Sequence, residues 1–348
     1  MKKIRIGDKE VGDQEPTFII AEAGSNHNRD INQAKMLIDV AIDAKADAVK
    51  FQTYSAEKLY SKKTPKPTYL EKITRKDETI WDLIKNIELP REFQAELADY
   101  CRDNDIIFLS TPFDHEAIEE LDALGVLAYK IASFEIVDIP LLKHAANKRK
   151  PMLISTGMAD IGDIEDALEA IYSAGNKQVA LLHCNIGYPP PMDIVNLRAI
   201  QTMERAFDIP VGFSDHTMST TIPAVAVAMG ACIVEKHFTL DRSMHGPDHP
   251  FALEPNELEE MVKNIRDVEM ALGSGIKQRT EAEEEMYRIG RRSIVAAQNI
   301  PTGAEITEEM LTVKRPGFGI KPKFLEIIIG RRAKVDIEED DIITWEMV

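Results

Sequence analysis

Residues 151–187 read PMLISTGMADIGDIEDALEAIYSAGNKQVALLHCNIG, and this stretch contains the pattern that decides the fold. Its two ends, 151–158 and 179–187, are apolar runs of the length that buried strands have. Between them, the apolar residues of Asp160–Ala174 recur at the three-to-four spacing of a helix. A strand, a helix and a second strand in this order are typical of a parallel sheet.

The same alternation continues on both sides of this stretch. Six more strand candidates are Thr17–Gly24, Ala48–Tyr54, Ile106–Phe113, Leu127–Glu135, Pro210–Thr217 and Cys232–Leu240. Eight strands separated by helical segments over about 270 residues fit the size and repeat of a TIM barrel. A doubly wound sheet is the main alternative, but no GxGxxG motif follows the first strand candidate. The sequence therefore predicts an α/β fold built on a (β/α)8 TIM barrel.

The pattern changes near residue 273. The sequence predicts a barrel domain over residues 1–272, in which Lys3–Val11 form a hairpin over one mouth. Residues 273–288 lack a strong apolar period and are expected to be a linker. Residues 289–348 contain short β-type runs broken by Pro-Thr-Gly and Pro-Gly turns. These runs predict a separate α+β domain of about 60 residues.

The composition limits the partners that this chain can bind. Lys and Arg number 42 against 59 Asp and Glu, and the net charge of −17 argues against nucleic-acid binding and docking on anionic lipid. No apolar run approaches the ~20 residues of a membrane span, and the N-terminus does not resemble a signal peptide. Three widely spaced cysteines argue against a disulfide scaffold or a zinc cluster. We expect a cytoplasmic protein with no nucleic-acid or membrane partner, in which any anion site is built locally.

Polar residues interrupt the apolar runs near the carboxyl end of every strand candidate. They include Glu22, Lys50, Gln52, Thr111, Lys130, Ser133, Ser155, Tyr188, His216, Glu235 and His237. Strand ends are often polar simply because turns follow, but here the charged residues come before the turn. Because the active site of a barrel enzyme lies at this face, the pattern predicts a catalytic mouth.

Two histidines at neighbouring strand ends are candidate metal ligands. Alternation along a strand turns His216 and His237 inward and Lys236 toward the helices. Two imidazoles on adjacent strands can chelate one metal ion and leave positions open for water and substrate. A single histidine is usually a satisfied core residue, so the prediction depends on the pairing. His245 and His249, after the last strand candidate, are competing candidates.

Lys50 and Lys130 form the second informative pair. An inward lysine in an acidic protein suggests an anion site or a Schiff base. Ser133 and Ser155 would complete a cradle for a phosphate or carboxylate, which favours an anionic substrate over a single-lysine aldolase. Either lysine alone can instead pack its stem and keep its head in water. Because Lys130 and Ser133 are an odd number of residues apart, both can face the site only if the strand bends or ends there.

These motifs, taken together and in order, resemble the sialic acid synthase family. The tail segment VKRPGFGI (313–320) resembles the C-terminal antifreeze-like domain of that family, also called a SAF domain. The resemblance covers nearly the whole chain. The barrel motifs that carry it are IIAEAGSNHN (19–28), VKFQT (49–53), STPF (110–113), YKIASFE (129–135), STGM (155–158), GFSDHT (212–217), EKHFTLD (235–241) and GPDHPFALEP (246–255).

The resemblance implies a metal-dependent condensation of phosphoenolpyruvate with an N-acetylated hexosamine in its open-chain aldehyde form, with phosphate released by C–O cleavage. We expect N-acetylmannosamine or a close analogue as the acceptor, which makes the chain an N-acetylneuraminate synthase. The alternative is a modified hexose, which gives legionaminate or, less in keeping with the 246–255 loop, pseudaminate. A non-catalytic carbohydrate-binding protein is the alternative from another class. It is disfavoured because such a protein has no need of two lysines, two histidines and a glutamate at one mouth.

The resemblance also assigns residues. It implies that His216 and His237 bind divalent Mn²⁺ or Mg²⁺ and that Glu22 lies beside the reacting centre. Arg315 would reach into the barrel of a partner subunit, so the family implies a homodimer with swapped C-terminal domains. The implied phosphoenolpyruvate contacts are Lys50, Thr111, Lys130, Ser133 and Ser155, and the implied sugar contacts are Gln52, Tyr188, Asp248 and Arg315.

Two segments depart from the family pattern. The family commonly has Cys-Thr after the sixth strand, where this chain has Cys184-Asn185, so Asn185 would replace a phosphate-binding hydroxyl. Residues 61–79, where the family has a sugar-contacting loop, cannot be matched one by one. Both departures concern the choice of acceptor sugar and leave the predicted reaction class unchanged.

Overall fold

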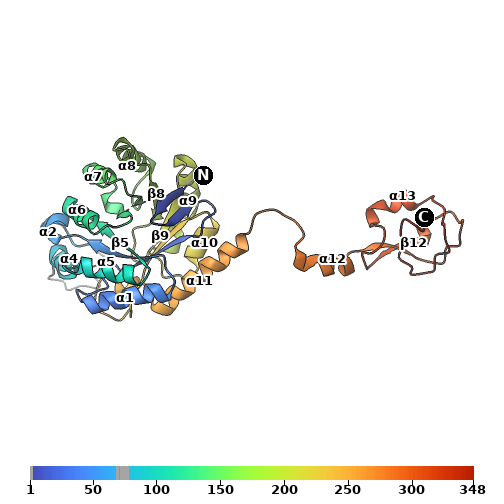
Figure 1. Cartoon of the computed structure of the whole chain (residues 1–348), viewed down its shortest axis with the longest axis horizontal. Helices are drawn as coiled ribbons and strands as arrows, with labels where there is room; N and C mark the ends of the chain where they lie inside the picture. The colour runs from blue at the N-terminus through green and yellow to red at the C-terminus, as the bar shows by residue number, and fades with distance from the viewer. Residues whose placement is uncertain (1–2, 68–69, 71–77) are drawn as a thin grey trace. The chain divides into compact units, whose positions relative to one another are not determined.

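The computed structural model describes residues 3–67, 70 and 78–348 of the chain. The chain forms two compact units, which divide between Gly273 and Ser274. Figure 1 shows both units.

The first unit is built on eight parallel strands. Their order around the sheet is β5-β4-β3-β10-β9-β8-β7-β6, and the end strands β5 and β6 lie next to each other, so the sheet curls into a nearly closed barrel. This confirms the predicted (β/α)8 architecture. The strands are β3 (Phe18–Glu22), β4 (Ala48–Thr53), β5 (Ile107–Pro112), β6 (Tyr129–Ile131), β7 (Met152–Ser155), β8 (Val179–Cys184), β9 (Val211–Asp215) and β10 (Ile233–His237).

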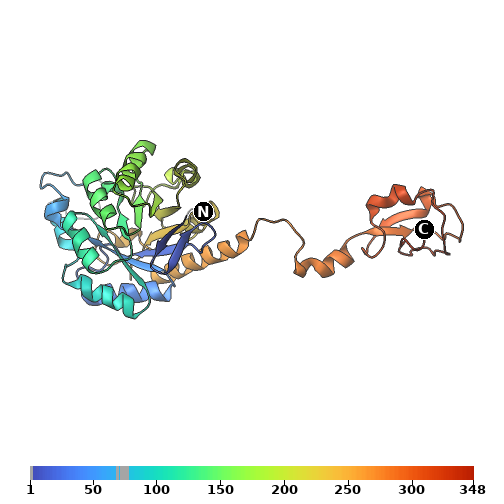
Figure 2. The same ribbon diagram turned by 45° about the horizontal axis from the view of Figure 1, so that its top comes forward.

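Helices surround these strands, as Figures 1 and 2 show. In the stretch 151–187, α8 begins after Asp160, whose carboxylate accepts hydrogen bonds from the backbone N–H groups of Gly162 and Asp163 and so caps the helix. Its buried residues, Ile164 and Ile171 among them, pack on the outside of the sheet. The helices that the structure describes in this unit are α1 (Ile31–Asp43), α2 (Ala56–Leu59), α4 (Ile80–Ile87), α5 (Phe93–Asp103), α6 (His115–Ala123), α7 (Ile139–Asn147), α8 (Ile161–Ser173), α9 (Arg198–Phe207), α10 (Ile222–Ala228) and α11 (Pro255–Leu272).

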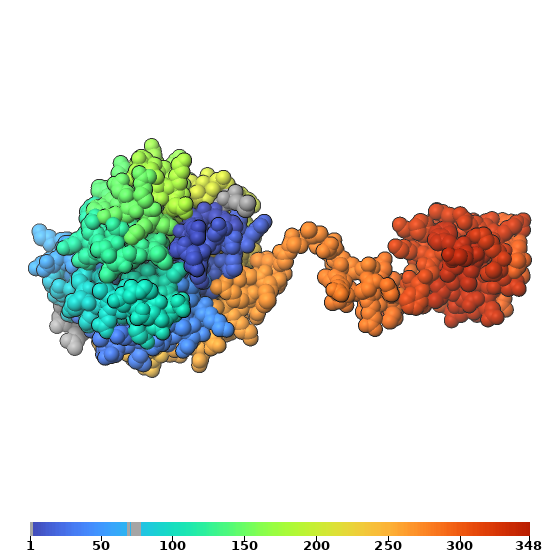
Figure 3. Space-filling view, viewed as in Figure 1, coloured from blue at the N-terminus to red at the C-terminus, as the bar shows by residue number. Residues whose placement is uncertain are grey.

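The interior of the barrel is layered. Its lower layer is apolar and includes Ile20, Leu109, Leu153 and Ile233. The N-terminal hairpin of β1 (Lys3–Ile6) and β2 (Lys9–Gly12) packs Ile4, Ile6 and Val11 against this layer and so closes one end of the barrel. The outer face of the hairpin remains at the surface, where Figure 3 shows it in dark blue.

Polar side chains form the next inward-facing layer because strand side chains alternate with a period of two. Two residues beyond Ile20 comes Glu22, and two beyond Leu153 comes Ser155. The same step leads from Ile233 to Glu235. The inward-facing side chains at the carboxyl ends of the strands therefore form a polar layer, which lies directly next to the apolar layer.

The second unit contains a small antiparallel sheet of β11 (Ser293–Ala296) and β12 (Leu311–Lys314) and a core of isoleucines such as Ile294 and Ile337. Its helices are α12 (Glu284–Gly290) and α13 (Leu325–Ile328). The segment expected to be a linker is partly helical, since α12 and a short 3₁₀ turn, Glu281–Glu283, lie within 281–290. Among the described residues, no helix combines the length and apolar character that crossing a bilayer would require. The other 3₁₀ turns among the residues that the structure describes are Ser133–Glu135, Met192–Ile194, His249–Phe251, Glu308–Met310 and Pro322–Phe324.

Candidate active site

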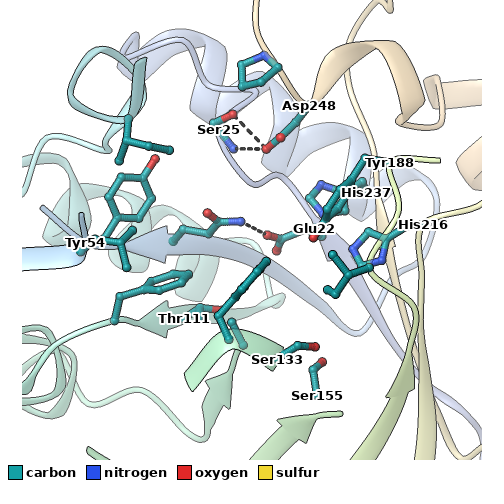
Figure 4. A pocket seen from close by; sticks show the side chains of 18 of the residues that line it. Glu22, Ser25, Tyr54, Thr111, Ser133, Ser155, Tyr188, His216, His237 and Asp248 are labelled. Atoms are coloured by element: carbon teal, nitrogen blue, oxygen red, sulfur yellow. Dashed lines mark hydrogen bonds between the residues drawn. The ribbon is translucent and has the colours of Figure 1, made fainter. Parts of the chain in front are cut away.

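A pocket of about 460 Å³ opens at the carboxyl ends of the barrel strands. Eleven of the twelve residues proposed from the sequence line it, and Figure 4 shows several of them. The twelfth, Arg315, is exposed in the second unit, directly after β12. The eleven are Glu22, Lys50, Gln52, Thr111, Lys130, Ser133, Ser155, Tyr188, His216, His237 and Asp248.

Glu22 and Lys50 form a buried ion pair at the centre of the pocket. Lys50 Nζ lies 2.7 Å from Oε2 of Glu22 and donates to Oγ1 of Thr111 at 2.8 Å. The amide of Gln52 donates to Oε1 of Glu22 at 2.9 Å. Burial raises the pKa of Glu22 even though Lys50 opposes the shift, so this carboxyl group holds a proton more readily than an exposed glutamate.

Glu235 is a second buried carboxylate in the pocket, and its pKa shifts the other way. Its Oε1 lies 3.4 Å from Lys130 Nζ and accepts a hydrogen bond from the hydroxyl of Ser214 at 2.8 Å. Burial would raise its pKa, but Lys130 and Lys50 outweigh burial and lower the pKa to about 2. One of the two glutamates therefore stays ionised, whereas Glu22 is the one poised to exchange a proton.

His216 and His237 lie side by side, with ring centroids 5.3 Å apart, and Figure 4 shows them beside Tyr188. Nδ1 of His216 is 3.2 Å from the carbonyl oxygen of Asn185, to which it can donate, and this leaves Nε2 as a free lone pair. Burial, followed by the neighbouring His237, lowers the pKa of His216 to about 3, so the ring is neutral. Nδ1 of His237 is buried without a hydrogen-bond partner.

The two histidines have the features of an open metal site. Neutral imidazoles are good ligands for divalent ions, and a ring nitrogen held by a backbone carbonyl is the usual support for a ligating histidine. Within the described part of the chain, no group of three or more His, Cys, Asp or Glu side chains forms a closed cage. The competing candidates do not line the pocket: His245 is exposed, and His249 is buried against the hydroxyl of Thr239.

Ser133 and Ser155 lie close together at the lower edge of the view in Figure 4. The hydroxyl of Ser155 is buried without a hydrogen-bond partner, and that of Ser133 accepts from the backbone N–H of Gly157 at 2.9 Å. Strand β6 ends at Ile131 and a 3₁₀ turn begins at Ser133. The chain therefore changes direction, and Lys130 and Ser133 both line the pocket despite their odd spacing.

Asp248 reaches the pocket from the loop after β10. Its Oδ2 accepts hydrogen bonds from the backbone N–H and the hydroxyl of Ser25, at 3.1 and 2.9 Å. The turn needs Gly24, because its φ is +52° and an added Cβ would lie 2.8 Å from Oδ2 of Asp248. Sequence spacing offers no sign of this contact between residues more than two hundred positions apart.

Several pocket residues were given no role from the sequence. Glu235, named from the sequence only among the polar strand-end residues, and Ser214 share strand faces with the two histidines, so alternation could have given both a place in the site. Glu135 lines the pocket, has a buried carboxyl oxygen without a hydrogen-bond partner, and has its pKa raised to about 8 by burial.

By contrast, the Asn185 amide donates to the carbonyl of Ile194 at 2.9 Å and does not line the pocket. Part of the unmatched loop, 68–69 and 71–77, lies outside the described residues.

Comparison with known families shows which family the chain belongs to. A sequence model of the NeuB family matches residues 37–277, more than half of the chain, and a SAF domain model matches residues 291–348. The chain belongs to the NeuB family. Its C-terminal unit contains a SAF domain, as predicted.

Relatives of this NeuB-family chain are named as synthases of sialic-type acids. The N,N'-diacetyllegionaminic acid synthase of Campylobacter jejuni is 44% identical over 94% of this chain and 98% of that protein. The human N-acetylneuraminate-9-phosphate synthase is 36% identical over 97% of this chain and 94% of that protein. A crystal structure of the N-acetylneuraminic acid synthetase of Leptospira borgpetersenii in complex with citrate superimposes with a TM-score of 0.74 at 36% identity. It covers 82% of this chain and 94% of the other.

Proposed function

We propose that this chain condenses phosphoenolpyruvate with an open-chain N-acetylated hexosamine to a nine-carbon sialic-type acid. The observation that carries the proposal is the polar layer of the barrel, where two lysines, two serines and two histidines meet in one pocket. The acceptor that we favour is a diacetylated hexosamine of the legionaminate type, because a named legionaminic acid synthase is 44% identical over nearly the whole chain. N-acetylmannosamine, giving N-acetylneuraminate, is the second candidate.

The chain's own residues would position phosphoenolpyruvate. Lys50 and Lys130 supply positive charge at the floor of the pocket, and the unpartnered hydroxyl of Ser155 is available to a phosphate or carboxylate oxygen. Ser133 and Thr111 add two hydroxyls around the same point. Holding C3 of phosphoenolpyruvate against the aldehyde carbon makes the reaction effectively unimolecular, which is a large part of the rate enhancement such a site can provide.

His216 and His237 would hold a divalent Mn²⁺ or Mg²⁺ ion. The free Nε2 of His216 and the orphaned Nδ1 of His237 supply the two protein ligands, and the remaining positions stay open for oxygen atoms. When bound, the ion supplies Lewis-acid polarisation of the sugar aldehyde. Gln52, Tyr188 and Asp248 line the same pocket and would orient the sugar hydroxyls and its N-acetyl group.

Glu22 would handle the proton that the reaction releases. Bond formation between C3 of phosphoenolpyruvate and the aldehyde carbon leaves the aldehyde oxygen as an alkoxide and positive character at C2. Water adds to C2 and loses a proton to Glu22, whose raised pKa suits a general base, and Glu22 returns that proton to the alkoxide to form the hydroxyl. The tetrahedral carbon forms the keto group by breaking its bond to the phosphate oxygen, and the proton of its own hydroxyl leaves with the inorganic phosphate.

The proposal includes a homodimer in which the second unit of one copy covers the barrel mouth of the other. Apolar side chains in the loops after β6, β7 and β8 are exposed, and in an isolated barrel they would be in contact with water. They are Phe134, Val137, Met158, Met192 and Ile194. Arg315, exposed in the second unit, would then reach the sugar in the partner's pocket.

Phosphate release tests the reaction. Phosphoenolpyruvate, Mn²⁺ and either acceptor should release inorganic phosphate, and ¹⁸O placed in the bridging position should leave with the phosphate. Unlabelled phosphate would contradict C–O cleavage, and no release with any N-acetylated hexosamine or divalent metal would contradict the reaction itself. A covalent adduct trapped by borohydride would indicate a Schiff-base aldolase instead.

Complementation tests the dimer. Arg315→Ala and His237→Ala should each be inactive alone. Co-expression of the two should restore about a quarter of the wild-type activity, because half of the random dimers then contain one intact site. Absence of any recovery in a purified mixed dimer would contradict the swapped arrangement.

A further inference from the structure

A buried ion pair lies next to the two histidines in the chain, and the proposed chemistry does not use it. Lys236 and Asp215 are each 1% exposed, and Nζ of Lys236 lies 2.6 Å from Oδ2 of Asp215. The two residues lie opposite each other on β10 and β9. Because side chains alternate along a strand, both point away from the inward-facing His216 and His237, which follow them by one residue. Neither Lys236 nor Asp215 lines the pocket.

The pairing of β9 with β10 stops just before the histidines. The last residues that pair these two strands are Lys236 and Asp215, and β9 itself ends at Asp215. His237 is still part of the sheet, since it lies opposite Glu22 on the neighbouring strand β3. His216 lies beyond the end of its strand. Contacts other than the β9–β10 pairing therefore set the position of His216 relative to His237.

The ammonium group of Lys236 makes such contacts. Besides its ion pair with Asp215, it donates to the carbonyl oxygen of Thr217, so it binds the residues on both sides of His216. The carboxylate of Asp215 closes the same turn, because it accepts from the backbone N–H and the hydroxyl of Thr217 at 2.8 and 3.0 Å. The short segment that carries His216 is thus fastened to β10, one residue before His237.

Stability alone does not explain why the fold buries two charges at this place. A buried ion pair loses the hydration of both groups, and well-packed apolar side chains of similar volume are often equally or more stabilising. Hydrogen-bonded charges differ from apolar packing because they fix the distance and the direction between the atoms that they join. Two ligands of one metal ion need such a fixed arrangement, to within about 0.5 Å.

We infer that Lys236 is a positioning residue for the metal site. It ties the segment around His216 to the strand that carries His237, and so holds the two imidazoles ready for one divalent ion before the ion binds. The inference rests on the proposed function, in which these two histidines hold Mn²⁺ or Mg²⁺. It adds a residue that contacts neither the ion nor a substrate.

Titration of Mn²⁺ into the metal-free enzyme tests this inference without any substrate, and EPR spectroscopy measures the free Mn²⁺. We expect the wild type to bind Mn²⁺ and His237→Ala to lose that binding. Lys236→Met should raise the Kd for Mn²⁺ by about 10–100-fold, the usual effect of removing a group that supports a ligating histidine. The titrations are made well below the lowest Tm of the set, so that the variants compared are folded.

Two further variants separate positioning from stability. Asp215→Asn combined with Lys236→Met removes both charges and should regain stability, but it lacks the ammonium that joins the strands and should still bind Mn²⁺ weakly. Leu121→Ala is the matched control. Leu121 is fully buried in α6, which follows β5, four strands away from β9 in the barrel. This variant should lower the Tm by a similar amount and keep the wild-type Kd.

Each outcome has one meaning. A wild-type Kd in folded Lys236→Met, or a Kd that rises with every loss of Tm, Leu121→Ala included, overturns the inference and leaves the proposed metal site standing. Recovery of both the Tm and the Kd in the double variant also overturns it, and this variant decides alone if Lys236→Met does not fold. No Mn²⁺ binding by the wild type, or binding that His237→Ala leaves intact, overturns the inference together with the proposed metal ligands.

Discussion

Replacing Lys236 with methionine should strongly destabilise the barrel. Lys236 is 1% exposed, its Nζ lies 2.6 Å from Oδ2 of Asp215, and it also donates to the carbonyl oxygen of Thr217. Asp215 is equally buried and accepts from the backbone N–H and hydroxyl of Thr217 at 2.8 and 3.0 Å. Methionine fills a similar volume but leaves a buried carboxylate without its counter-charge.

The expected magnitude follows from this burial. Removing one partner of a buried ion pair costs about 3–5 kcal/mol, because the remaining charge stays desolvated. At about 2–4 °C per kcal/mol for a large domain, the Tm of the barrel should fall by about 10 °C. Combining Asp215→Asn with Lys236→Met removes both buried charges. The amide oxygen of the new asparagine side chain can still accept the hydrogen bond from the backbone N–H of Thr217. The double variant should therefore recover most of the lost stability.

Calorimetry on the wild type and the variants measures these changes. Lys35→Met is the matched control: Lys35 Nζ lies 2.6 Å from Glu96, but the two side chains are 29% and 56% exposed. An exposed pair of this kind contributes less than about 1 kcal/mol. The reasoning is refuted if Lys236→Met costs no more than Lys35→Met, or if the double variant is less stable than Lys236→Met alone.

Three further predictions concern the pocket. Chelation of the divalent metal should stop phosphate release, and added Mn²⁺ should restore it. The His237→Ala variant should keep the wild-type Tm but stay inactive when Mn²⁺ is added. Full activity of that variant would reject His237 as a ligand. Gly157→Ala would put a Cβ 2.8 Å from Ser133 Oγ. The KM for phosphoenolpyruvate should therefore rise about tenfold, and overpacking should lower the free energy of unfolding by about 1–3 kcal/mol. Unchanged kinetics would show that Ser133 does not contact the substrate. Burial raises the pKa of Glu135 to about 8, so this group binds its proton more tightly when folded, and the stability it contributes is lost as pH rises from about 4 to 8. Between pH 6 and pH 9, Glu135→Gln should therefore lose less Tm than the wild type in calorimetry, and parallel losses would contradict the shifted pKa.

Alternation along the strands explains how much of the pocket could be predicted. Residues two positions apart on a strand face the same side, so Glu22 points inward like Ile20, and Ser155 points inward like Leu153. Neighbouring strands of the barrel then place these polar side chains in one layer. The local pattern in residues 151–187 also predicted the fold: the helix expected over Asp160–Ala174 is α8, which spans Ile161–Ser173. Local pattern was sufficient wherever the backbone stays regular.

Irregular backbone and long-range packing account for what could not be predicted. The contact of Asp248 with Ser25 joins two loops, and the loop glycine that permits it, Gly24, adopts a positive φ that no spacing rule reveals. Helix α4 has an ordinary amphipathic pattern, which predicts a helix with one apolar face. Whether that face meets the core or a substrate pocket depends on the tertiary structure, and here it meets the pocket.

The charge balance of the pocket shows what a chain of net charge −17 would need in order to hold the proposed anionic substrate. Lys50 and Lys130 are not free cations: each pairs with a buried glutamate, Glu22 or Glu235. With both glutamates ionised, these four groups sum to zero, whereas phosphoenolpyruvate brings a carboxylate and a phosphate. Because Glu22 has to be ionised to act as the proposed base, the excess negative charge would be met by the divalent ion proposed at the histidines. A pocket built this way stays neutral when empty, and under the proposed function it would bind its anionic substrate strongly only together with that ion.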